Sequence, residues 1–153
     1  RTVLPPFDGT LVEKAVTVDD GQNQLYYVAQ KKGKAIGVAT VCTGGGYGGP
    51  IEVMVGILPD NSIYGVKLLR HQETPGLGAK ASNIDFCSQF EGKKLNTSEQ
   101  KLSVVKAGEK ASDQNLAINA ITAATITSAA FTKAVNKALI IFMENKKELV
   151  GNS

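Results

Sequence analysis

The first half of the chain is a succession of short β-type runs, and this feature constrains the fold most. Five runs rich in β-branched and aromatic residues are separated by turn signals such as DDGQN, KGK and PDNS. They occupy residues 11–18, 25–31, 35–43, 51–58 and 63–71. Strands joined by turns, with no helices between them, favour an antiparallel meander. The sequence therefore predicts a sheet in which successive strands pair with one another.

A long amphipathic helix is expected near the C-terminus. From about Thr127 to Lys147, apolar residues recur at spacings of three and four, which places them on one face of a helix. Lys146 and Lys147 suit the negative end of the helix dipole, and Gly151 lies just beyond them. The preceding segment is less regular. It indicates a short helix within 83–93 and a strand around 102–106, and it leaves 116–122 ambiguous.

These elements together predict an α+β fold in one domain spanning residues 1–153. We expect a twisted, mainly antiparallel sheet with the long C-terminal helix and short helices packed on it. A hydrophobic fraction of 42% and a charged fraction of 20% suit a globular chain with a real core. The net charge of +3 comes from scattered lysines. Such small clusters are typical of solvated surface and argue against a nucleic-acid interface.

A few single residues limit the kinds of site that the chain can hold. Cys42 and Cys87 match no metal-ligand spacing, so they form either one disulfide or two free thiols. His71 is the only histidine, which excludes a multi-histidine metal site and leaves a hydrolase triad with a single candidate. The longest strongly apolar run, residues 138–143, is far shorter than the ~20 residues of a membrane span.

The glycine stretch GGGYGG at 44–49 formally fits the dinucleotide fingerprint G-x-G-x-x-G. That fingerprint needs a helix to follow, whereas Pro50 and a β-type run follow here. No Gly-Lys-Ser/Thr closes the run, so a phosphate-binding Walker loop is absent as well. Two interpretations remain. The stretch is either a flexible connection that interrupts two strands, or a backbone that lies close to a flat ligand, with Tyr47 stacking on it.

A second loop, ETPGLGAK at 73–80, follows the last strand-like run. The turn signal Thr74-Pro75-Gly76 and the further glycine Gly78 keep this loop free of bulk. It is either an ordinary connection or a loop that clamps a ligand. In the second case its glycines admit the ligand and Leu77 covers an aromatic face.

The stretch TAATITS at 122–128 carries four hydroxyl side chains where the long helix is expected to begin. Free backbone N–H groups and the dipole make a helix start favourable for a phosphate. Thr127 or Ser128 can cap the helix, which leaves Thr125 as a surplus hydroxyl. The stretch therefore serves either capping and small-residue packing, or a phosphate that Thr125 binds or is esterified by.

The same stretch resembles the flavinylation motif D-x-x-[ST]-G-A-T of the FMN-binding domain family. Residues 119–125 correspond to it, with Asn119 in place of the aspartate and Ala123 in place of the glycine. The loops 46–51 and 73–80 also resemble that family, in the same order along the chain. The resemblance spans residues 35–140. Three ordered motifs indicate the family far more strongly than one motif alone.

The resemblance implies that FMN is joined by a phosphoester bond to the hydroxyl of Thr125. It also implies backbone contacts to the phosphate from the neighbouring small residues and a lining of the ribityl chain and ring by the second loop. We add Tyr47 as a residue flanking the ring and Lys106 as a cation offsetting the phosphate charge. The expected cofactor-binding residues are therefore Thr125, Thr122, Ala123, Ala124, Tyr47, Glu73, Thr74, Leu77, Gly78 and Lys106.

Members of this family include the G subunit of the Rnf electron-transport complex and the C subunit of the sodium-pumping NADH:quinone reductase. The resemblance thus implies an electron-carrier subunit that passes electrons between other subunits of a membrane-bound, ion-translocating oxidoreductase. It implies a domain on the extracytoplasmic side of the cell membrane, an anchoring helix N-terminal to Arg1, and a flavin transferase that uses FAD and magnesium. The alternatives are a flavin module of a free-standing or extracellular flavin reductase, and a structural subunit without flavin.

Overall fold

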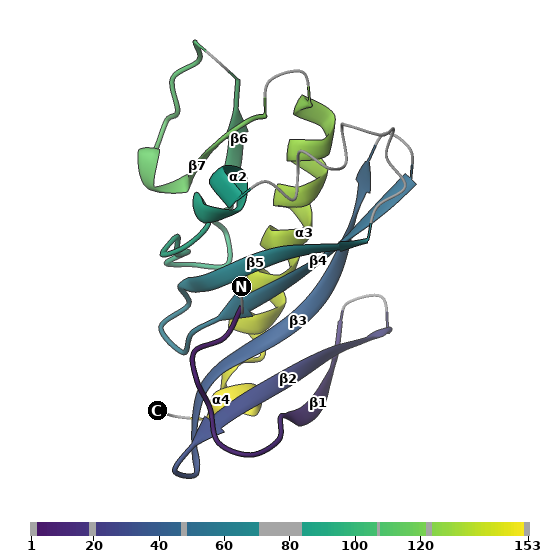
Figure 1. The fold of residues 1–153 in the computed structure, drawn as a ribbon, viewed down its shortest axis with the longest axis vertical. Coiled ribbons are helices and arrows are strands. Elements are labelled where there is room, and N and C mark those ends of the chain that lie inside the picture. The colour runs from purple at the N-terminus through teal and green to yellow at the C-terminus, as the bar shows by residue number, and fades with distance from the viewer. Residues whose placement is uncertain are drawn as a thin grey trace.

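Five antiparallel strands form the main sheet of the protein (Figure 1). The computed structural model describes residues 3–18, 21–46, 49–70, 84–106, 108–121 and 124–151. The strands are β1 (Val12–Thr17), β2 (Asn23–Lys31), β3 (Lys34–Gly46), β4 (Gly49–Ile57) and β5 (Ile63–Arg70). Their order in the sheet is β1-β2-β3-β4-β5, and each pairs antiparallel with the next. The predicted meander is confirmed.

The turns between these strands explain the register. Lys32 and Gly33 connect β2 to β3 with φ values of 54° and 77°. Positive φ at both central residues is the two-residue hairpin turn that matches the twist of the flanking strands. Between β4 and β5, Asn61 has φ 75°, and Ser62 donates from its backbone N–H to the Asp60 carboxylate at 3.0 Å. Hydrogen bonds from Ser62 lower the pKa of Asp60 below its ordinary value.

The described glycines of this stretch lie in strands, so β3 and β4 extend further into it than the sequence predicts. The stretch still connects these two strands, as the first interpretation expects. β3 runs through Gly46 and β4 begins at Gly49, with Gly44 opposite Ile51 and Gly46 opposite Gly49. Glycine has low β propensity, yet the ladder to β4 carries the strand through the run. Buried Gly44 has a packing role, because a methyl group built on it would overlap the carbonyl oxygen of Ala130 in the long helix.

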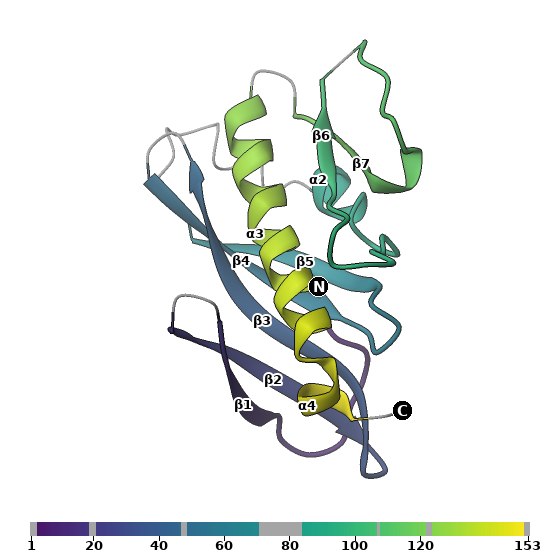
Figure 2. The ribbon, with the colours of Figure 1, turned by 180° about the vertical axis from the view of Figure 1, so that it is seen from behind.

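The long helix α3 (Thr125–Glu144) packs on one face of the sheet, against β3 and β4 (Figure 2). It begins two residues before the expected start and ends before Lys146 and Lys147. The Asn145 backbone N–H donates to the carbonyls of Ile141 and Phe142, both at 3.1 Å. After this break the short helix α4 (Lys146–Val150) turns back so that its last two residues are buried, and Gly151 closes it with φ 76°.

α3 is long and apolar enough to cross a membrane by length and composition alone. Most of it is buried within the domain, where Phe131, Leu139 and Phe142 are fully covered. Tyr26 of β2 also reaches it, since its buried hydroxyl donates to the Ala138 carbonyl at 2.7 Å. α3 is therefore the core helix of an α+β domain, as the sequence predicts.

A second, smaller sheet lies beside α3. Its two strands, β6 (Ser103–Val105) and β7 (Ala117–Asn119), are parallel. The 3-10 turn η1 (Gln114–Leu116) precedes β7, which resolves the stretch left ambiguous by the sequence. The predicted helix within 83–93 is confirmed but shorter, because α2 (Ile84–Ser88) gives way to turns that end at Gly92 with φ 82°.

Three phenylalanines join the α2 region to α3. The ring centroids of Phe86 and Phe90 lie 5.2 Å and 5.3 Å from that of Phe131, and 5.4 Å from each other. Edge-to-face aromatic pairs add about 0.5–1.5 kcal/mol to the burial of each ring. All three rings are buried, so the cluster holds α2 close to the first turns of α3.

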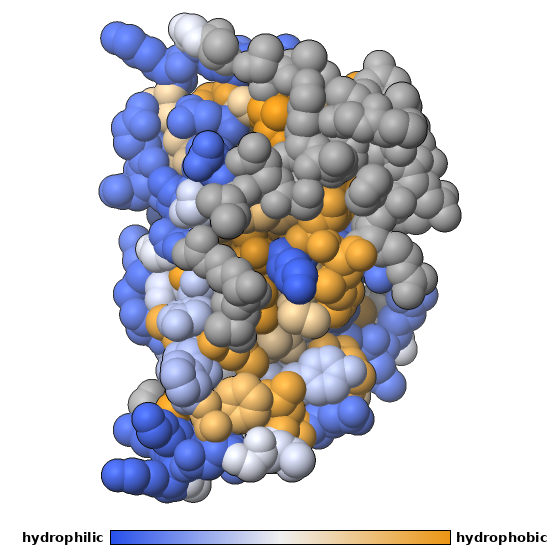
Figure 3. Space-filling model, in the orientation of Figure 1, coloured by the Kyte–Doolittle hydropathy of each residue, from blue (hydrophilic) through white to orange (hydrophobic). Residues whose placement is uncertain are grey.

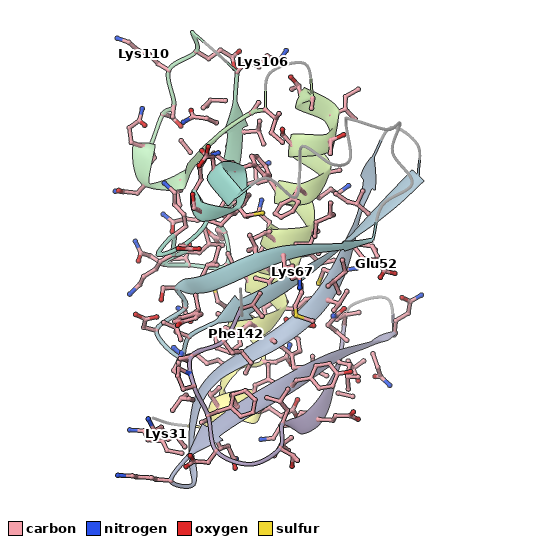
Figure 4. The ribbon with its side chains drawn as sticks, in the orientation of Figure 1. Lys31, Glu52, Lys67, Lys106, Lys110 and Phe142 are labelled. Atoms are coloured by element: carbon pink, nitrogen blue, oxygen red, sulfur yellow. The ribbon has the colours of Figure 1, made fainter. Side chains whose placement is uncertain are left out.

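On the opposite face of the sheet, the described residues form only a partial cover. Residues Val3 and Leu4, named here the N-terminal strap, lie over Gly56 and Gly37, where an added methyl group would meet the strap. Beside the strap lies an apolar hollow of about 510 Å³, in which Lys67 is the charged residue among apolar neighbours. Figure 3 shows a hydrophobic patch in the middle of this face with hydrophilic residues around it, and Figure 4 labels Lys67 there.

Neither Cys42 nor Cys87 forms a disulfide in the structure. Cys42 is buried in β3, and Cys87 in α2 is half-buried. Burial raises the pKa of the Cys42 thiol to about 11, with the Lys137 charge opposing the shift. Cys42 is therefore protonated and unreactive in the folded protein at neutral pH.

The buried thiol predicts a loss of stability in alkaline solution. Cys42 has an ordinary pKa of 9.0 and a folded-state pKa of about 11, so the unfolded chain releases this proton first. The stabilisation is complete below pH 9 and is lost as the pH rises toward 11. Its full size is about 2–3 kcal/mol. Urea unfolding across this range should show a smaller loss for Cys42→Ala than for the wild type. An equal loss in both would contradict this assignment.

Candidate functional site

The described ends of the three sequence motifs converge at one end of the domain. The hairpin end of β3 and β4 meets the start of α3, because Gly44 packs on Ala130 in the second turn of that helix. The end of β5 joins them, because Glu52 near the start of β4 pairs with Arg70. Figure 1 shows these ends together in the upper half of the molecule. The fold thus brings together segments that are far apart in sequence.

A strand–loop–helix unit forms the centre of this end. β7 runs parallel to β6, and the Ala120 N–H extends the pairing by donating to the Val105 carbonyl at 2.9 Å. The chain then leads into α3 at Thr125. The start of α3 therefore lies just beyond the carboxyl ends of two parallel strands. Backbone N–H groups at such a helix start form a favourable site for an anion.

Two side-chain amides hold this unit in place. Gln89 donates to the Asn119 carbonyl at 3.1 Å and accepts from the Asn119 N–H at 2.7 Å. Asn136 in α3 binds Leu102 in the same two-way manner, at 2.9 Å and 2.8 Å. Each side-chain amide binds both the N–H and the carbonyl of one backbone residue, as a neighbouring strand would. The position of Asn119, the first residue of the motif, is thereby tied to the turn after α2, and the residue before β6 is tied to α3.

The hydroxyls of the TAATITS stretch do not cap α3 as expected. The N-cap residue is Ala124, which makes no side-chain capping bond. Ser128 instead bridges the loop and the helix: its Oγ accepts from the Ile121 N–H at 2.9 Å and donates to the Ala124 carbonyl at 2.8 Å. The prediction of a cap at Thr127 or Ser128 is wrong, because the helix begins two residues earlier.

Thr125 is the first residue of α3 and is half-buried. Its hydroxyl has no hydrogen-bond partner within the described part of the chain, so it makes no capping bond there. As the first three helical residues, Thr125, Ile126 and Thr127 have backbone N–H groups without an intrahelical acceptor. The surplus hydroxyl expected from the sequence thus lies beside backbone donors that have no acceptor within α3.

Thr127 is the residue that the sequence interpretation missed. It is 1% exposed, and its Oγ1 has no hydrogen-bond partner among the described residues. Most buried hydroxyls in folded proteins have one. A pattern of hydroxyls in the sequence cannot distinguish a bonded hydroxyl from an unbonded one, so no sequence signal marks Thr127.

The other predicted site residues are only partly covered by the structure. Ala124 precedes Thr125 and is buried. Lys106 follows β6, is exposed, and donates its backbone N–H to the Glu109 carboxylate at 2.8 Å. Figure 4 shows Lys106 at the same end of the molecule as the start of α3. The remaining residues lie outside the described parts of the chain: Tyr47, His71, Glu73, Thr74, Leu77, Gly78, Thr122 and Ala123.

The fold and this end of the molecule define a class of α+β domain in which the start of the core helix is favourable for an anion. The family model for the FMN-binding domain matches residues 46–140. The chain belongs to the FMN-binding domain family, whose cofactor is FMN. The family membership expected from the three motifs is confirmed.

Curated relatives belong to ion-translocating complexes. The chain is 43% identical over 114 residues to the G subunit of the proton-translocating ferredoxin:NAD(+) oxidoreductase complex of Clostridium ljungdahlii, covering 74% of this chain and 57% of the relative. It is 39% identical over 123 residues to the G subunit of the Na(+)-translocating ferredoxin:NAD(+) oxidoreductase complex of Acetobacterium woodii, covering 79% and 56%. The chain thus spans just over half the length of these relatives.

Solved structures agree with the fold. The C subunit of the Na(+)-translocating NADH-quinone reductase from Parabacteroides distasonis superposes with a TM-score of 0.67 at 29% identity, covering 80% of this chain and 62% of that one. NqrC of Shewanella oneidensis superposes with a TM-score of 0.71 at 24% identity, covering 90% and 70%. The second likeness shows the fold alone.

The described residues fit the phosphate end of FMN. The oxygens of a phosphate group act as hydrogen-bond acceptors. The start of α3 offers backbone N–H groups that have no acceptor within the helix, together with the Thr127 hydroxyl, which has no partner among the described residues. The small side chain of Ala124 leaves room at the N-cap. The arrangement therefore suits an anionic, oxygen-rich group.

Proposed function

We propose that the chain is the electron-carrier domain of a membrane-bound, ion-translocating oxidoreductase. In this proposal it holds FMN by a phosphoester bond to Thr125 and relays electrons between neighbouring subunits. The observation that carries the proposal is the position of Thr125 as the first residue of α3. Its hydroxyl has no partner among the described residues, and the neighbouring backbone N–H groups have no acceptor within the helix. The two relatives from ferredoxin:NAD(+) oxidoreductase complexes support the type of complex.

The covalent step is a phosphoryl transfer from FAD. The Thr125 oxygen attacks the phosphorus on the FMN side of the FAD anhydride. A threonine O–P bond forms, the anhydride P–O bond breaks, AMP leaves, and the hydroxyl proton is released. A flavin transferase with magnesium supplies the catalysis. Nothing is oxidised or reduced in this step. The free N–H groups of Thr125, Ile126 and Thr127 then stabilise the charge of the phosphodiester.

The chain's own residues bind and orient the cofactor, and FMN supplies the electron transfer. Ala124 provides space at the helix start, and Lys106 offsets phosphate charge. The roles of the residues outside the described ranges remain predictions from the resemblance. We propose backbone contacts to the phosphate from Thr122 and Ala123, and a ring and ribityl lining from Glu73, Thr74, Leu77, Gly78 and Tyr47.

The proposed setting is the extracytoplasmic side of the cell membrane. The partners in this proposal are the other subunits of the complex and, during maturation, the flavin transferase. An anchoring helix N-terminal to Arg1 remains a prediction. We assign no substrate acid or base, because electron transfer through an exposed ring edge needs neither.

Intact-mass measurement tests the proposal. The protein is produced with and without a flavin transferase, and we expect a gain of one FMN less one water only with the transferase. No gain would contradict the covalent carrier and favour a structural subunit without flavin. The variant Asn119→Asp with Ala123→Gly, which restores the motif, shows whether these two positions prevent attachment. Rapid oxidation of NADH by the isolated flavinylated domain would instead favour a flavin reductase.

A further inference from the structure

We infer that Thr127 is a positioning residue for the cofactor, and that its hydroxyl donates a hydrogen bond to the phosphate of FMN. This inference rests on the proposed function only in taking FMN as the ligand at the start of α3. It does not depend on the covalent bond to Thr125. The observation behind it is the Thr127 Oγ1 atom, which is buried and has no hydrogen-bond partner among the described residues.

The contrast with the other buried hydroxyls makes this atom informative. Four polar side chains of the described residues are buried: Thr40, Thr127, Ser128 and Thr132. Thr40 donates to the Leu25 carbonyl at 2.6 Å. Ser128 and Thr132 donate to the carbonyls four residues before them, Ala124 and Ser128, at 2.8 Å and 2.9 Å. Thr127 makes no such bond within the described ranges, although it lies on the same helix.

The position of Thr127 in the helix places its side chain near the helix start. Every Cα–Cβ bond in an α-helix tilts toward the N-terminus. Thr127 is the third residue of α3, so no full helical turn lies between its side chain and that end. Its hydroxyl and the free N–H groups of the first turn therefore offer donors at the same place. Together they match a group with several acceptor oxygens.

The stability of the flavin-free protein shows whether the Thr127 hydroxyl serves a ligand or the packing of the domain. A buried hydroxyl without a partner destabilises the protein that carries it. Valine has nearly the same shape as threonine but no polar atom. Thr127→Val should therefore leave the unfolding midpoint of the flavin-free protein unchanged or raise it. Thr132→Val is the matched control. The same change there removes a bond at 2.9 Å, so that midpoint should fall.

Binding of free FMN and of riboflavin to the flavin-free protein provides the direct test, because the two ligands differ only by the phosphate. We expect wild type to bind FMN more tightly than riboflavin. Thr127→Val should weaken FMN binding by about 10- to 100-fold, the usual effect of a hydrogen bond to a charged group. It should leave riboflavin binding unchanged. Thr127→Ser, which retains the hydroxyl, should bind FMN like wild type, and Thr132→Val should leave both affinities unchanged.

Three results would overturn the inference. These are a wild type that binds FMN no better than riboflavin, a Thr127→Val variant that loses affinity equally for both, and a fall in midpoint for Thr127→Val like that for Thr132→Val. Failure of the mass gain in the transferase experiment is a separate outcome. If phosphate-dependent binding requires Thr127 while no mass gain occurs, the covalent attachment is refuted and the Thr127 contact holds.

Discussion

Replacing Thr125 by valine should abolish covalent flavin completely, without loss of the fold. Valine keeps the shape of the side chain but removes the oxygen that the ester requires. The hydroxyl of Thr125 has no partner among the described residues, so stability should change by less than about 0.5 kcal/mol. Intact mass after production with the transferase measures the result directly, and flavin fluorescence of the denatured band supports it.

Two variants sharpen this prediction. Thr125→Ser retains a hydroxyl at the same position and should keep part or all of the attachment. Thr132→Val removes a hydroxyl further along the same helix and should be flavinylated like wild type. A full mass gain in Thr125→Val would mean that another residue carries the ester. Peptide mapping would then identify it, with Thr122 as the nearest alternative in the motif.

Replacing Gly44 by alanine should be strongly destabilising and should also reduce flavin loading. The added methyl group would overlap the carbonyl oxygen of Ala130. A backbone atom within a helix cannot rotate away as a flexible side chain can, so α3 must shift from β3. Overpacking of this kind costs about 3 kcal/mol. Because Thr125 lies less than two turns from the overlap, the shift moves the attachment site as well. Urea unfolding and the flavinylated fraction by mass measure the two effects.

Gly56→Ala is the matched control for this result. There the added methyl group would overlap the Val3 carbonyl oxygen, on the opposite face of the sheet. Stability should fall because the N-terminal strap is displaced, while flavin loading of the folded fraction should stay normal. Equal losses of loading in the Gly44 and Gly56 variants would contradict a local effect at the start of α3. They would instead show that loading follows overall stability.

The sheet and the core helix could be predicted because their signals are repeated. Each strand has a β-type run with a turn signal at its end, and α3 repeats its apolar spacing over several turns. The boundaries were less predictable. The glycine run from Gly44 to Gly46 has no strand propensity of its own, so its place in β3 depends on the ladder to β4. β6 and β7 have three residues each, too few for any periodic pattern.

For the candidate site, the motif predicts the position of Thr125 but not the division of roles among the hydroxyls. Thr125 could be found because several motif residues surround it. Ser128 and Thr127 were both expected to cap, and only the folded chain shows that one bridges the loop and the other has no partner in the described ranges. The amide of Gln89 is recruited from 30 residues away. Gln89 binds the backbone of Asn119, and every residue type has these backbone groups. No sequence pattern therefore predicts this contact.

The N-terminal strap shows that the packed domain extends beyond the residues that match the family. The family match covers residues 46–140. β1, β2 and nearly all of β3 precede it, and α4 follows it. Even Val3, which belongs to no helix or strand, contributes its carbonyl to the cover over Gly56. A domain trimmed to the matched residues would lose most of the sheet under α3, and the last turn of α3 itself. The boundaries for any shortened version of the protein therefore follow from its packing contacts and not from its motifs.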